Sequence, residues 1–284
     1  MKKIFTVVLI MMLSTATAYE ERFPEPTSDE FQESEKIIES HGKAEVFSLS
    51  YSELFKFLWN RYVRGPSESF QYYGCNPATL TSEQACLPAT ILLHANSSNQ
   101  GQWIPLINAL EKVPNFGPVF TFNFDQKTDL LKLIQKIEAI VVLYQEAGEN
   151  HVSLNLVGHS LGTFASSEYA FDPDLWVNNT TVKKVISIAG RLKNIEPPTE
   201  SPHYAYCYDI LERVESIWEK IQKNRGIVEL YTIAAENDWL VPQESVLVGD
   251  DDEHKAIIPD TGHVLVPYNQ STHDFVIQWL LNEK

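Results

Sequence analysis

The sequence predicts an α/β fold in which helices cover both faces of a mostly parallel sheet. Five apolar runs of strand length follow one another between residues 89 and 235. Several of these runs are separated by segments that carry a helical apolar stripe. Apolar strands that alternate with helices are typical of a parallel sheet that is covered on both faces.

The individual elements follow from the same patterns. The strands are expected, in chain order, at 89–95, 118–124, 151–158, 182–189 and 227–235. Between the second and third strands, residues 129–145 place Leu130, Leu133 and Ile137 on one side of a helix. The chain ends with another helical pattern at 272–281. A helix at 129–145 would form one of the crossover connections that parallel strands require, and both helices would help to cover the faces of the sheet.

Residues 1–18 have the pattern of a secretory signal peptide. Two lysines precede an apolar stretch from Ile4 to Leu13, and small residues lead up to Ala18. The apolar stretch is only about half as long as a helix that spans a bilayer core. We therefore expect cleavage after Ala18, a secreted or periplasmic protein, and no integral membrane segment once the signal is removed.

Residues 19–88 precede the first predicted strand and are expected to form an N-terminal helical extension packed on the body of the protein. An amphipathic pattern at 50–63 supports a helix there. In an exported protein, cysteines that lie close in sequence are expected to pair. This predicts a Cys75–Cys86 disulfide and leaves Cys207 as a free thiol.

The charge and the ligand spacings exclude several classes of partner. The chain has 22 Lys and Arg against 38 Asp and Glu, so its formal net charge is −16 at pH 7. Such an excess of negative charge repels a phosphate backbone, which argues against nucleic acid as a partner. The histidines and cysteines do not have the spacing of metal ligands, so neither a metal nor another cofactor is expected.

Residues 191–226 interrupt the alternation of strands and helices and are too long for an ordinary connection. Tyr204, Tyr206 and Tyr208 lie in a proline-containing first half, and Trp218 belongs to a helical apolar stripe in the second half. Two interpretations stay open. The segment is either a helix packed on the sheet or a small cap over a substrate pocket.

A candidate nucleophile lies where the third predicted strand ends. The strand runs into the sequence GHSLG at 158–162 and then into a helical pattern. A serine in such a tight strand-to-helix turn projects its hydroxyl clear of the sheet. The flanking glycines remove side chains that would collide with backbone, and the helix N-terminus favours negative charge nearby. Ser160 is therefore the candidate nucleophile, and His159 beside it is expected to be structural.

A serine nucleophile needs a base and an acid that orients the base. In this type of site the acid precedes the histidine, and each follows a strand. Asp238 follows the fifth predicted strand, and His263 precedes the final helix. Glu236 and His273 are the alternatives. Asp238 fits the loop spacing better than Glu236, and His273 lies within the final helix, where we expect a surface histidine.

Three motifs make residues 89–284 resemble the α/β-hydrolase superfamily. GHSLG matches its nucleophile elbow at Ser160, NDWLVP matches its acid loop at Asp238, and TGH matches its histidine loop at His263. The resemblance implies the α/β-hydrolase fold, and under the cap interpretation residues 191–226 are a small cap insertion in it.

The resemblance also implies which groups stabilise an oxyanion. His94-Ala95-Asn96 is similar to the His-Gly segment that precedes the superfamily's oxyanion-hole residue, although alanine replaces the glycine here. The backbone N–H groups of Leu161 and Asn96 are therefore expected to bind the oxyanion.

Together these residues predict an exported serine hydrolase that cleaves carboxylic esters, lipid esters among them, through a Ser-His-Asp triad and an acyl-enzyme. Its partner would be a small-molecule ester or a lipid. An acyltransferase, an amidase or peptidase, and a non-catalytic binding protein stay open as alternatives, because one fold supports many functions.

Overall fold

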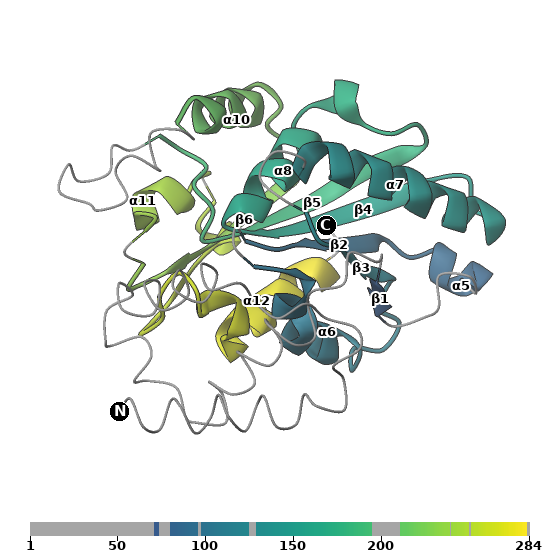
Figure 1. Cartoon of the computed structure of the whole chain (residues 1–284), viewed down its shortest axis with the longest axis horizontal. Helices are drawn as coiled ribbons and strands as arrows, with labels where there is room; N and C mark the ends of the chain where they lie inside the picture. The colour runs from purple at the N-terminus through teal and green to yellow at the C-terminus, as the bar shows by residue number, and fades with distance from the viewer. Residues whose placement is uncertain are drawn as a thin grey trace, which may run out of the picture. The chain divides into compact units, whose positions relative to one another are not determined.

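The described part of the chain is built on one β-sheet. The structure, a computed structural model, describes residues 71–73, 80–95, 98–124, 129–194, 211–238, 240–249 and 251–282. The strands in this part of the chain form one seven-stranded sheet in the order β1-β3-β2-β4-β5-β6-β7 (Figure 1). β1 is antiparallel to β3, and the remaining pairs are parallel. The predicted α/β class with a mostly parallel sheet is confirmed.

The bounds of the elements are as follows. The strands are β1 (Gln71–Tyr73), β2 (Ala89–Leu93), β3 (Val119–Thr121), β4 (Val152–His159), β5 (Thr180–Ile188), β6 (Glu229–Ala235) and β7 (Lys255–Ile258). The α-helices of the described residues are α5 (Ser82–Ala85), α6 (Ile104–Leu110), α7 (Asp129–Glu146), α8 (Leu161–Ala170), α10 (Leu211–Lys223), α11 (Gln243–Val246) and α12 (Gln270–Leu281). The short 3-10 helices are η3 (Gln100–Trp103), η4 (Pro173–Leu175), η5 (Asp252–His254) and η6 (Val266–Tyr268).

Helices cover both faces of the sheet. Figure 1 shows α7, α8 and α10 on one face and α6 and α12 on the other. Neighbouring residues of one strand contribute to different faces. On β2, Ile91 and Leu93 belong to the core formed with α7 and α8, whereas Leu92 belongs to the core formed with α6 and α12. All three are fully buried, which explains why this strand is apolar on consecutive residues.

The structure adds two strands to the five predicted ones. β1 lies within residues 19–88, the segment expected to be helical, and β7 follows the acidic residues Asp251–Glu253. Both are too short to show an apolar run, and β7 begins with a lysine. Their positions are set by pairing with β3 and β6, which are contacts between distant parts of the chain that a local pattern does not reveal.

Parts of the predicted N-terminal region lie outside the described residues. These are the signal peptide at 1–18 and the helical pattern at 50–63. Among the helices that the structure describes, none is long and apolar enough to cross a membrane.

The expected disulfide is not present at Cys86. Cys86 is a free, exposed thiol whose Sγ donates a hydrogen bond to Oε1 of Glu149 at 3.3 Å. This hydrogen bond to a carboxylate raises the pKa of the Cys86 thiol, which disfavours the thiolate that disulfide chemistry requires. Cys75 and Cys207 lie outside the described residues.

The second half of the insertion is a packed helix. Val214, Ile217 and Ile221 of α10 are buried in the core that α7 and α8 also form, and Trp218 packs against that core. The packed-helix interpretation therefore applies to α10. Residues 195–210, which include the three tyrosines, lie outside the described residues, and the cap interpretation stays a prediction for them.

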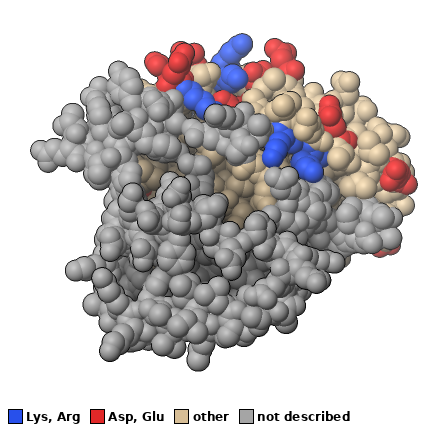
Figure 2. All heavy atoms as spheres, viewed as in Figure 1, with Lys and Arg blue, Asp and Glu red and all other residues tan. Residues whose placement is uncertain are grey.

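An ion cluster attaches α10 to α7 and α8. The guanidinium of Arg213 donates to Glu168 from Nε to Oε1 at 2.9 Å and from Nη2 to Oε2 at 2.6 Å. The same Nη2 lies 2.7 Å from Oδ2 of Asp129, whose side chain is 5% exposed. Burial raises the pKa of the Asp129 carboxyl, against the opposing attraction of Arg213. In the view of Figure 2, acidic and basic side chains are also interspersed over the described surface of α10 and α7.

Replacing Arg213 with methionine is expected to lower the free energy of unfolding by about 3 kcal/mol at pH 7, because two largely buried carboxylates lose their cation. Without Arg213, the pKa of Asp129 in the folded state rises further above its value in the unfolded chain. The folded variant therefore gains protons more readily as the pH falls, and the loss should shrink toward about pH 4. Urea unfolding at pH 7 and pH 4.5 measures both effects.

Lys220→Met is the matched control for this substitution. Lys220 also lies on α10 but pairs with Asp172 at 3.0 Å, and both side chains are partly exposed to solvent. Its loss should cost less than about 1 kcal/mol. Equal losses in the two variants, or a loss for Arg213→Met that does not depend on pH, would contradict a buried anchor.

Candidate active site

Ser160 lies in a strained turn between β4 and α8. Its backbone has φ 52° and ψ −114°, a region that residues with a side chain rarely occupy. Its N–H donates to the carbonyl of Ile188 at the end of β5, at 2.9 Å, and its own carbonyl accepts from Thr163 N–H at 3.1 Å. These contacts hold the turn, and the hydroxyl of Ser160 lies within hydrogen-bonding distance of His263.

The glycines on either side of Ser160 permit this turn because backbone approaches them closely. A Cβ atom at Gly162 would lie 2.2 Å from the carbonyl oxygen of Leu93, and one at Gly158 would lie 2.5 Å from the backbone nitrogen of Thr163. Both distances are far below van der Waals contact. The first contact also places the elbow against the end of β2, next to the segment that begins with His94.

The loops after β6 and β7 bring Asp238 and His263 to Ser160. His263 Nε2 lies 2.9 Å from Ser160 Oγ, and His263 Nδ1 lies 2.7 Å from Asp238 Oδ2. The side chains of His263 and Asp238 are 6% and 2% exposed. In such a dry site a hydrogen bond to a carboxylate is strong. The structure therefore brings together the three residues that the sequence selected.

Asp238 is held from its other side. Its Oδ1 accepts hydrogen bonds from the backbone N–H groups of Leu240 and Val241, at 2.9 and 2.8 Å. With one carboxylate oxygen fixed on these two donors, the other is directed at His263 Nδ1. The proton of the imidazole is consequently on Nδ1, so that Nε2 has a lone pair that can accept the hydroxyl proton of Ser160.

Glu236, the alternative acid, has a different position. It is exposed, and its Oε2 accepts the backbone N–H of Asp260 at 2.8 Å. Asn237 N–H adds a second link by donating to the carbonyl of Thr261 at 2.9 Å. Glu236 thus ties the acid loop to the turn that precedes His263.

His273, the alternative base, is not the surface residue that the sequence led us to expect. It is 3% exposed, and its Nε2 bonds to the carbonyl oxygen of Pro267 at 2.9 Å. Burial lowers the pKa of its imidazole. The sequence held a signal for this position, because His273 shares a helical face with Val276 and Leu280, which are also buried.

Of the two oxyanion candidates, Leu161 lies within the described residues and Asn96 does not. Leu161 is the first residue of α8, where a backbone N–H has no acceptor within the helix and the helix dipole favours negative charge nearby. The residue two positions before Asn96, His94, is fixed by a bond from Phe124 N–H to its Nε2 at 3.2 Å and by stacking on the Phe124 ring.

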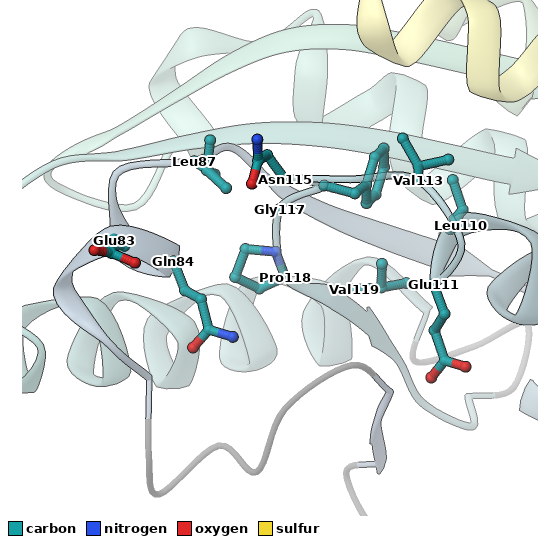
Figure 3. A pocket seen from close by; sticks show the side chains of 11 residues that line it. Glu83, Gln84, Leu87, Leu110, Glu111, Val113, Asn115, Gly117, Pro118 and Val119 are labelled. Carbon is teal, nitrogen blue, oxygen red and sulfur yellow. The ribbon is translucent and has the colours of Figure 1, made fainter.

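A pocket of about 790 Å³ lies at the opposite edge of the sheet (Figure 3). Leu87 and Pro118, which precede β2 and β3, line it together with Glu83 and Glu111. Because β2, β3 and β4 are parallel, this pocket lies at the amino ends of strands, whereas Ser160 follows a carboxyl end. It is therefore separate from the site at Ser160. Within the described ranges, no group of His, Cys, Asp and Glu could hold a metal ion.

Comparisons with known proteins give a match in structure only. No protein-family model and no curated protein matches the chain. A lipase of Bacillus licheniformis in its mature form is similar at a TM-score of 0.53 and 14% identity, over 76% of this chain and 99% of that one. A Bacillus subtilis carboxylesterase gives a TM-score of 0.47 at 13% identity, over 82% and 98% of the two chains. A monoacylglycerol lipase of Paleococcus ferrophilus gives 0.45 at 17% identity, over 68% and 95%. At these identities the likeness concerns the fold, and any chemistry has to be argued from the residues around Ser160.

Proposed function

The chain has the α/β-hydrolase fold, and from this premise and the geometry at Ser160 we propose that it is an exported serine hydrolase of carboxylic esters, lipid esters among them. The observation that carries the proposal is the continuous hydrogen-bond chain from Ser160 Oγ through His263 to Asp238. Ser160, His263 and Asp238 thus lie at hydrogen-bonding distance in the order nucleophile, base and orienting acid.

The reaction follows from the direction of these bonds. His263 Nε2 takes the hydroxyl proton as Ser160 Oγ attacks the acyl carbonyl carbon, and Asp238 stabilises the imidazolium that forms. The Leu161 N–H, and that of Asn96 by the sequence argument, bind the oxyanion; losing one such donor typically raises the barrier by about 3 kcal/mol. The imidazolium then protonates the departing alcohol. Water, activated by the same histidine, hydrolyses the acyl-enzyme and releases a carboxylic acid.

Export is proposed on the sequence of residues 1–18. An N-terminal segment with leading lysines, a short apolar stretch and a small-residue cleavage site is typical of secretion. N-terminal sequencing of the protein recovered outside the cytoplasm should begin at Tyr19.

The proposed chemistry is tested with a panel of p-nitrophenyl esters of increasing acyl length, together with a phospholipid and an anilide. We expect release of p-nitrophenol and of the free acid, with little cleavage of the anilide. Transfer of the acyl group to an added alcohol in preference to water would instead identify an acyltransferase. Preferred cleavage of the anilide would identify an amidase or peptidase.

We also propose that the tyrosines of the insertion select the acyl group. Tyr206→Ala should lower kcat/KM for long-chain esters by about tenfold and leave the acetyl ester within about twofold, because a short acyl group reaches Ser160 without the insertion. The chain-length profile of kcat/KM measures the difference. Trp218→Ala is the control: Trp218 packs against the core, so its loss should lower thermal stability without changing the profile. An equal loss of kcat/KM on all esters in Tyr206→Ala would contradict the cap interpretation.

A further inference from the structure

A chain of buried hydrogen bonds joins the three segments that meet at Ser160. Ala95 N–H donates to Gln102 Oε1 at 3.2 Å, and Gln102 Nε2 lies 3.3 Å from His159 Nδ1. His159 Nε2 lies 2.9 Å from the carbonyl oxygen of His263. Gln102 and His159 are 1% and 3% exposed. The chain therefore connects the end of β2, the elbow and the histidine loop through the protein interior.

The groups at the two ends fix the direction of every bond. Ala95 N–H can only donate, so the Gln102 atom that faces it is the amide oxygen, and the amide nitrogen faces His159. The carbonyl of His263 can only accept, so the proton of His159 is on Nε2. Neutral His159 then accepts at Nδ1 the hydrogen bond that Gln102 donates. A doubly protonated His159 would place two donors against each other at Gln102.

From this arrangement we infer that His159 and Gln102 are positioning residues for the proposed hydrolysis, on which this inference rests. His159 adjoins the nucleophile and binds the backbone of the base, from which it is separated by 104 positions in the sequence. One hydrogen bond thus sets the position of the His263 backbone relative to Ser160. Gln102 binds the backbone N–H of Ala95, which lies within the predicted oxyanion segment His94-Ala95-Asn96. Small displacements of a base from its nucleophile have large effects on rate.

Two substitutions at His159 distinguish the effect of its bond to the His263 carbonyl from that of its bond to Gln102. A glutamine at this position can place its amide nitrogen near the site of Nε2 and keep the bond to the His263 carbonyl. An asparagine can place its amide oxygen near the site of Nδ1 and keep only the bond from Gln102. We expect His159→Asn to lower kcat by about tenfold or more, which corresponds to about 1.4 kcal/mol in the barrier, with KM within about twofold. His159→Gln should recover most of this loss.

His151→Asn is the matched control, because His151 is an exposed histidine that precedes β4 at its other end and bonds to Thr181. It should leave kcat and KM unchanged. Melting temperatures of the three variants show whether stability alone explains the rates. If His159→Asn and His159→Gln lose stability with kcat unchanged, or lose kcat equally, the inference is overturned.

A spectroscopic measurement keeps this test separate from the proposed function. The proton between His263 Nδ1 and Asp238 should give a downfield proton resonance in the protein as it is and in His159→Gln, and should shift or broaden in His159→Asn. An unchanged resonance in His159→Asn would overturn the inference even if the protein hydrolyses esters. If the protein hydrolyses no ester, the proposed function fails, and the resonance still decides whether His159 positions His263.

Discussion

Replacing Ser160 with alanine is expected to lower kcat on carboxylic esters by about 10⁴–10⁶-fold. Ser160 Oγ is the atom that forms the acyl bond in the proposed reaction, and His263 Nε2, the proposed base, lies 2.9 Å from it. Turnover of the acetyl ester measures the loss. Mass spectrometry after treatment with a fluorophosphonate should also find the adduct on Ser160 in the unsubstituted protein and no adduct in the variant.

Ser153→Ala provides the matched control, because Ser153 lies on the same strand, β4, at its amino end. It should retain full labelling and full turnover. Labelling of another serine, with activity preserved in Ser160→Ala, would contradict the assignment of the nucleophile.

The second large effect is expected from Asp238→Asn, at about 10⁴-fold in kcat. The two backbone N–H groups of Leu240 and Val241 will hold the amide oxygen where Oδ1 now lies. The amide NH₂ then faces His263 Nδ1, which must become an acceptor and lose its proton to Nε2. With its proton on Nε2, the imidazole donates to Ser160 Oγ and cannot remove the hydroxyl proton. The fold should be preserved, because Asn has nearly the same shape.

Glu236→Gln distinguishes this mechanism from the alternative acid. Because Glu236 accepts only one described backbone hydrogen bond, from Asp260, and is exposed, we expect less than about a threefold change in kcat. The ester assay at pH 8 measures both variants. A large loss in Glu236→Gln with near-normal rates in Asp238→Asn would reverse the assignment of the acid.

The sequence predicted those elements whose side chains are buried on both faces of the sheet. β4 and β5 are buried over most of their length, and their fully buried apolar residues, such as Leu156 and Val185, produce the apolar runs that the sequence shows. β7 has no such run: it begins with Lys255, and Ile257 is 48% exposed. Only its pairing with β6 makes it a strand, and that pairing depends on the folded sheet.

In the candidate site, too, some residues could be predicted from local sequence patterns and others could not. Ser160, Asp238 and His263 each occur in a short motif that follows or precedes a recognisable element, so their order along the chain was sufficient to select them. Gln102 could not be found, because it lies in a 3-10 helix without a motif and is separated from His159 by 57 positions in the sequence. Its role depends on two hydrogen bonds that exist only once β2 and β4 are paired.

The order of the strands has a consequence for how the proposed activity would be lost. β4 carries Ser160, the segments after β6 and β7 carry Asp238 and His263, and β5 lies between β4 and β6. Four adjacent strands must therefore stay in register for the three side chains to remain aligned. A local opening of the β5–β6 ladder would separate base from nucleophile while the helices stay intact. During gradual unfolding, ester turnover would then be lost before the helical circular dichroism signal decreases. An ester assay would therefore report on the pairing of strands β4 to β7.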